Sequence, residues 1–101
     1  MDLPIICTLT EAELRERRRD VLESVRTAAI ETLSLPNGYV YRFAPGSEIL
    51  TTLARLVALE HQCCRFLTFK MLVEPGDGPI SLEVTGPPEA KAMIAEFLGS
   101  S

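Results

Sequence analysis

The chain has 101 residues, 47% of them hydrophobic, and its 14 acidic and 10 basic residues give a net charge of −4. This length and apolar content suffice for one α/β domain over residues 1–101, whose core requires neither metal ions nor disulfides. The negative balance argues against a nucleic-acid partner, because phosphate binding needs a surplus of clustered Lys and Arg.

The sequence also argues against a membrane partner and a disulfide framework. It lacks a run of about 20 apolar residues, and Asp2 is acidic where a signal peptide is basic. Three cysteines, two of them adjacent, fit thiols in a reducing compartment better than paired disulfides. We therefore expect a cytoplasmic protein.

The first predicted elements are a strand and a helix. Residues 5–9 have the two-residue period of a strand, with Cys7 on the same face as its apolar neighbours two positions away. Thr10 and Glu13 form a capping box that starts a helix. The basic run 17–19 is flanked by acids and is predicted to face water. Residues at three- and four-residue spacing predict a stripe packed on a sheet: Leu14, Arg18, Val21, Leu22, Val25 and Ala29.

The remaining elements alternate hairpins with helices. Residues 30–35 and 39–43 are predicted strands, and the Asn-Gly pair between them supplies the positive φ angles of a tight turn. A helix over residues 47–64 and strands over 66–73 and 79–85 follow. A Gly-Pro pair then opens a last helix, whose apolar stripe comprises Ala90, Met93, Ile94, Phe97 and Leu98.

This order predicts an α+β fold, a two-layer sandwich with helices on one face of a mostly antiparallel sheet. The first six elements follow the βαββαβ pattern of a ferredoxin-like core, to which a C-terminal strand and helix are added. In that arrangement the strand over residues 5–9 is central and antiparallel to the strand over residues 66–73.

The chemistry of the sequence is concentrated at the end of the second predicted helix. Glu60 and Cys64 fall within the helix's apolar arc, together with Ile49, Leu53, Leu56 and Val57. A buried carboxylate needs a polar partner, and we expect a backbone amide, the hydroxyl of Tyr39 or Tyr41, or an arginine. Cys63 lies about 100° round the helix, off the stripe.

These residues predict a site for a soft metal ion. Adjacent cysteines diverge on a helix, but they can share an ion if the helix ends between them. Cys7, on the predicted central strand, would lie below Cys64. The predicted ligands are Cys7, Cys63, Cys64 and His61, with Glu60 behind them, and thiolates with an imidazole suit Zn²⁺, Cu⁺ or Hg²⁺.

Two other functions fit the same residues. The protein is alternatively a thiol-dependent redox or transfer enzyme acting on a thiol-reactive ligand, although a helix C-terminus disfavours a thiolate. It is otherwise an interaction module, such as a homodimer, in which the cysteines only pack as small hydrophobic residues.

Five segments spread over nearly the whole chain carry a resemblance to a known family: residues 7–10, 13–18, 37–39, 60–69 and 82–87. The most specific is Glu60-His61-Gln62-Cys63-Cys64-Arg65-Phe66, which is similar to the Glu-x-x-Cys-Cys-Pro-Phe signature of a group of small bacterial proteins. Such proteins are sometimes found with mercury- or other metal-resistance genes. The resemblance implies Cys7, Glu60, Cys63 and Cys64 as site positions and implies no established activity.

The chain departs from that signature at two positions. Arg65 replaces the proline, which lets the helix run on by about one residue. His61 stands where an arginine is expected, which removes one candidate partner for Glu60.

Overall fold

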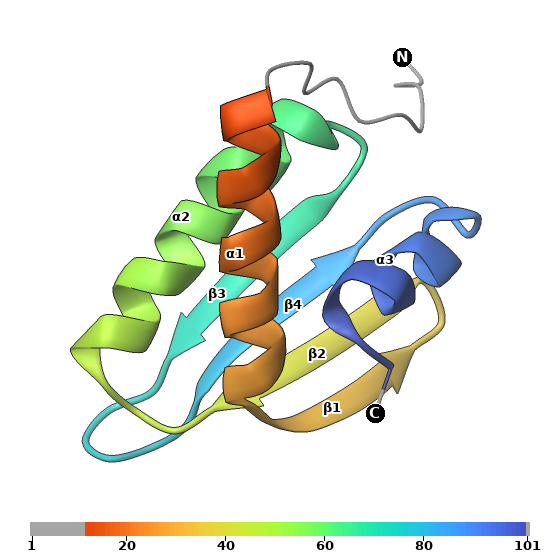
Figure 1. Ribbon diagram of the computed structural model, residues 1–101. Helices are drawn as coiled ribbons and strands as arrows, with labels where there is room; N and C mark the ends of the chain where they lie inside the picture. Colours follow the sequence, from red (N-terminus) through yellow and green to blue (C-terminus); the bar gives the residue numbers. More distant parts are fainter. Residues whose placement is uncertain (1–11, 101) are drawn as a thin grey trace.

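The computed structural model describes residues 12–100, which form three helices and one antiparallel sheet (Figure 1). The helices lie together on one face of the sheet, so the predicted α+β two-layer sandwich is confirmed. The elements follow in the order α1 (Ala12–Ala28), β1 (Ala29–Leu35), β2 (Gly38–Phe43), α2 (Ser47–Cys63), β3 (Thr68–Val73), β4 (Ile80–Thr85) and α3 (Ala90–Leu98).

The sheet has the order β1-β2-β4-β3, with every neighbouring pair antiparallel, and is consistent with a ferredoxin-like arrangement. Leu82 of β4 lies opposite Tyr41 of β2 on one side and Met71 of β3 on the other. The central position predicted for residues 5–9 is therefore occupied by β4, and that part of the prediction is wrong. Residues 5–9 themselves, like Thr10 of the capping box, lie outside the described part of the chain.

The choice of β4 as a central strand follows from its composition. Its alternate residues Ile80, Leu82 and Val84 are buried, and they face the helix layer between two flanking strands. In a central position, the buried side chains of a strand contact neighbours on two strands, which stabilises the sheet more than the contacts of an edge strand do. The buried core also contains Tyr39, Tyr41 and Phe43 of β2, Leu22 and Val25 of α1, Leu53 and Leu56 of α2, and Ala90, Ile94 and Leu98 of α3.

The β1–β2 hairpin forms as predicted, but its turn differs. Leu35 pairs with Gly38, so the loop consists of Pro36 and Asn37. Neither Asn37 nor Gly38 has a positive φ. The first loop residue is Pro36, whose ring fixes its own φ at a negative value and so excludes the turn with two positive φ angles. Glycine is required at position 38 for a different reason: a Cβ there would overlap the Val84 carbonyl oxygen of β4.

The helices agree with the sequence pattern to within a few residues. α2 begins at Ser47 as expected and ends at Cys63, whereas α3 begins only at Ala90. Between Gly86 and α3 the chain makes a turn, in which the Ala90 amide donates to the Pro87 carbonyl. Over the described range, every helix is too short or too polar to cross a bilayer.

Candidate metal centre

The end of α2 brings the two adjacent cysteines together. Cys63 is the last helical residue, and Cys64 leaves the helix with φ −119° and ψ 75° while its amide still donates to the Glu60 carbonyl. The direction of the Cys64 side chain is therefore no longer set by the helical rotation. The two Sγ atoms lie 3.6 Å apart, and the residues are only 1% and 0% exposed. The condition under which adjacent cysteines can share an ion is met.

Cys63 lies in the core, contrary to the prediction that it sits off the apolar stripe. The buried residues of α2 are Leu53, Leu56, Glu60 and Cys63, which recur at spacings of three and four. Val57 and Ile49, which belong to the predicted apolar arc, are only partly buried. The stripe is thus rotated toward Cys63, and Cys64 becomes buried because the helix has already ended.

Glu60 is buried and bound by an arginine, which confirms the expectation that it needs a polar partner. Arg18 of α1 approaches with Nε 2.7 Å from Oε1 and Nη2 3.2 Å from Oε2, and the side chains are 15% and 4% exposed for arginine and glutamate. Two parallel N–H donors satisfy both carboxylate oxygens in the geometry that guanidinium groups favour. The Tyr41 hydroxyl, another proposed partner, donates instead to the Gly99 carbonyl at 2.7 Å.

The sequence pattern placed Arg18 on the inward stripe of the first helix but did not pair it with Glu60. The run 17–19 was also predicted to face water, and this holds for Arg17 and Arg19, which are exposed, but not for Arg18. The available signal was position, because Arg18 lies four residues before Leu22 on the face of α1 that packs inward. A charged residue on that face needs a buried counter-charge.

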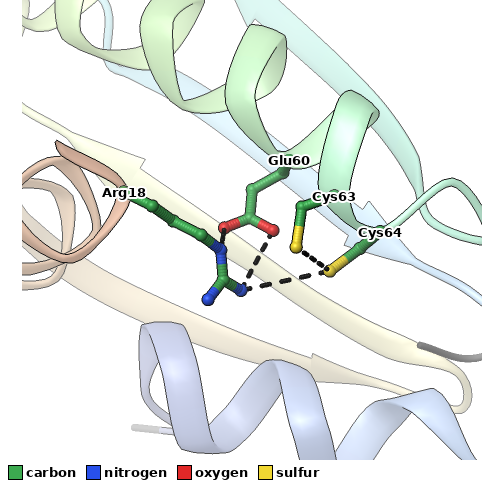
Figure 2. A network of polar contacts seen from close by, with 4 residues as sticks. All are labelled: Arg18, Glu60, Cys63 and Cys64. Atoms are coloured by element: carbon green, nitrogen blue, oxygen red, sulfur yellow. Dashed lines mark hydrogen bonds and ion pairs between the residues drawn. The ribbon is translucent and has the colours of Figure 1, made fainter. Parts of the chain in front are cut away.

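Arg18 also links the carboxylate to the thiols. Figure 2 shows contacts of its guanidinium with both Glu60 and Cys64, and Nη2 lies 4.0 Å from the Cys64 Sγ. On its other side the guanidinium stacks over the ring of Phe97 in α3, 4.4 Å from the centroid. One side chain of α1 therefore contacts the functional groups of α2 and an aromatic residue of α3.

Glu60, Cys63 and Cys64 together form a group that can hold a metal ion. Their candidate ligand atoms all lie within 4.8 Å of one another, and all three residues are buried. Sulfur donors with one carboxylate suit borderline and soft ions rather than Mg²⁺ or Ca²⁺, which prefer oxygen.

Of the other two predicted ligands, only His61 belongs to the described part of the chain, and it is not a member of this group. His61 is exposed on the last turn of α2. Cys7 lies outside the described residues, and the central strand position from which it would lie below Cys64 is occupied by β4. Its ligand role stays a prediction.

Comparisons with known proteins add no family to this description: no protein-family model, no curated protein and no solved structure matches the chain.

Proposed function

We propose that the protein binds a soft metal ion, Zn²⁺, Cu⁺ or Hg²⁺, through the thiolates of Cys63 and Cys64 and the carboxylate of Glu60. The observation that carries the proposal is the 3.6 Å separation of two buried sulfur atoms beside a buried carboxylate. Packing alone gives no reason to place an ionised side chain in that position, because burying a charge costs free energy even when it is paired.

The sulfur separation favours an ion with bent coordination. Two metal–sulfur bonds of about 2.3 Å that span 3.6 Å enclose an angle of roughly 100° at the metal. This is close to the tetrahedral angle of Zn²⁺ sites. A linear dithiolate, in contrast, would require the two sulfur atoms to separate by about twice the bond length.

Arg18 supplies the positive charge of the site. It neutralises Glu60 and lies near the Cys64 sulfur, so it stabilises negative charge on both. Each Glu60 oxygen accepts one hydrogen bond from Arg18 and keeps a second lone pair, so the carboxylate could bind an ion while the guanidinium holds it in place.

The proposal is tested by metal titration of the folded protein against a competing chelator, with native mass spectrometry to count bound ions. We expect one ion per chain and an affinity at least tenfold weaker for Cys63→Ala and for Cys64→Ala, each of which removes a covalently bonding ligand. Equal uptake by wild type and both variants would overturn the proposal.

His61→Ala is the matched control, because His61 lies on the same helical turn but is exposed. Unchanged affinity is expected if the three buried residues form the site. A loss comparable with that of the cysteine variants would add the imidazole to the ligand set, and Cys7→Ala tests the third thiol in the same way. The likeness to the Glu-x-x-Cys-Cys-Pro-Phe proteins and the cytoplasmic location stay predictions from sequence.

A thiol-dependent redox or transfer enzyme is the second candidate, favoured by one observation. The positively charged guanidinium of Arg18 lies 4.0 Å from the sulfur of Cys64, the kind of neighbour that reactive cysteines often have. Alkylation of metal-free protein distinguishes this function. Modification of Cys64 at neutral pH much faster than a small-molecule thiol, and its loss in Arg18→Met, would support it.

A further inference from the structure

The strand β3 lies at one side of the sheet that residues 12–100 form. Over residues 12–100 it pairs only with β4, in a regular register from Thr68 opposite Thr85 to Val73 opposite Ile80. Three consecutive apolar residues near its end are exposed: Met71 by 42%, Leu72 by 57% and Val73 by 54%. Residues 71–73 themselves contain no charge or proline, the residues with which proteins often block strand addition, and the charged residues Lys70 and Glu74 flank them.

The sequence of this edge is complementary to itself. When two copies of β3 are laid antiparallel with Leu72 opposite Leu72, Met71 lies opposite Val73 and Lys70 lies opposite Glu74. Opposite charges that face each other across strands stabilise the pairing. Centring the pair on Met71 instead would place Lys70 opposite Leu72 and would lose this match.

The same register agrees with the faces of the sheet. Lys70 and Leu72 lie opposite Glu83 and Ser81 of β4, on the face away from the buried core, and Lys70 Nζ is 3.6 Å from a Glu83 oxygen. A residue that faces its own copy lies on a two-fold axis perpendicular to the sheet. Both helix layers would then cover the same side of one continuous sheet.

We propose that a second copy of this chain docks on β3, so that the two sheets join edge to edge about Leu72. Main-chain hydrogen bonds supply the attraction, and the two symmetric Lys70–Glu74 pairs fix the register. One strand pair buries little surface compared with an obligate dimer, so the dimer forms in a concentration-dependent manner. This proposal is independent of the thiol site.

The test is sedimentation velocity of the full chain over a wide concentration range. Glu74→Lys places like charges opposite each other at both symmetric positions, and we expect the dimer dissociation constant to rise at least tenfold. The double variant Lys70→Glu/Glu74→Lys restores opposite charges and is expected to regain most of the lost affinity. Glu96→Lys, which makes the same charge change at an exposed position of α3, is the matched control and should leave dimerisation unchanged.

Leu72→Lys adds a second test on the two-fold axis, where the new charge faces its own copy. We expect a monomer at all concentrations. At dilutions where the wild type is also monomeric, we expect an unchanged melting temperature, because Leu72 is exposed in the monomer. A wild-type chain that stays monomeric throughout the range would overturn the proposal. So would a dimer that Glu74→Lys and Leu72→Lys leave intact, because its interface must lie elsewhere.

Discussion

At the scale of single residues, the Arg18–Glu60 pair explains how a glutamate is tolerated beside two buried cysteines. The pair is bidentate and nearly excluded from water. Buried ion pairs offset their own desolvation only approximately, whereas removal of one partner leaves an uncompensated charge. The pair is therefore better explained by the site that it forms than by the stability that it adds.

If Arg18 is the main counter-charge of Glu60, substitutions of the two residues should have strongly non-additive effects on the free energy of unfolding. Arg18→Met should lower the free energy of unfolding by about 3 kcal/mol, because it leaves the Glu60 carboxylate buried without its main counter-charge. Arg18→Met/Glu60→Met should recover most of that loss, since an apolar pair needs no desolvation. Urea denaturation of the single and double variants measures the coupling, and simple additivity would contradict it.

The two cysteines should respond alike to a polar replacement, since both are buried. Cys63→Ser and Cys64→Ser should each lower the free energy of unfolding by about 1–3 kcal/mol if the hydroxyl finds no partner. The sequence pattern placed only Cys64 on the buried stripe and so predicted destabilisation by Cys64→Ser alone. Thermal melts of the two variants distinguish this prediction from burial of both cysteines. A Cys63→Ser protein that melts like wild type would contradict the buried position of Cys63.

The buried phenol of Tyr41 should lower the free energy of unfolding of the protein in alkali. Burial, and to a smaller extent the neighbouring Tyr39, raises the pKa of Tyr41 well above its ordinary value. The folded state then favours the neutral phenol, and this contribution is complete below about pH 10, where the unfolded tyrosine is also neutral. Above that pH, the free energy of unfolding falls by up to about 1.4 kcal/mol for each pH unit, because only the unfolded tyrosine ionises.

The Tyr41→Phe variant isolates this effect. It should lose about 1 kcal/mol at neutral pH with the hydrogen bond to the Gly99 carbonyl. Its stability should also decline less steeply than that of wild type between pH 10 and 11. Urea unfolding at a series of pH values measures both, and parallel pH profiles would show that Tyr41 ionises as easily in the folded state as in the unfolded one.

The sequence pattern predicted which residues form the described site better than it predicted how they are arranged. Burial of Glu60 followed from its place on an apolar helical face, and the need for a counter-charge followed from that burial. The partner Arg18 is 42 positions away in the chain, and local periodicity carries no information on which arginine reaches it. The roles of Cys63 and Cys64 depended on the exact helix end, which patterns locate only to within a few residues.

At the scale of elements, the close approach of β2 and β4 restricts which residue can occupy position 38. Gly38 lies opposite Thr85, and its missing side chain lets the backbone of β4 approach. The Asn-Gly pair predicted the hairpin correctly but for a reason that does not apply, because the turn contains no positive φ. The true reason lies in a strand 46 positions later in the sequence and is not visible in the local pattern.

Substitution at this glycine should therefore be costly. Gly38→Ala forces β2 and β4 apart and should lower the free energy of unfolding by about 2 kcal/mol or more, within the range of overpacked sites. Gly46→Ala is the control, because a Cβ there meets nothing within 4 Å and its φ of 168° is extended backbone. Similar melting temperatures for the two variants would contradict the close approach at Gly38.

At the scale of the whole molecule, the described helices and strands could be predicted from periodicity and turn residues, but the sheet order could not be predicted completely. The pattern placed residues 79–85 as an addition to a completed core, whereas β4 is central. Strand order depends on long-range pairing that local patterns do not encode. The strand order also affects the predicted metal site, because the position of Cys7 below Cys64 was predicted from that order.

The central claim, that Cys63 and Cys64 together bind a metal ion, is tested most directly by X-ray absorption at the zinc edge of the protein loaded with one equivalent of Zn²⁺. We predict at least two sulfur neighbours at about 2.3 Å, reduced by one in Cys63→Ala and in Cys64→Ala. A first shell made only of oxygen and nitrogen at about 2.0–2.1 Å would contradict it.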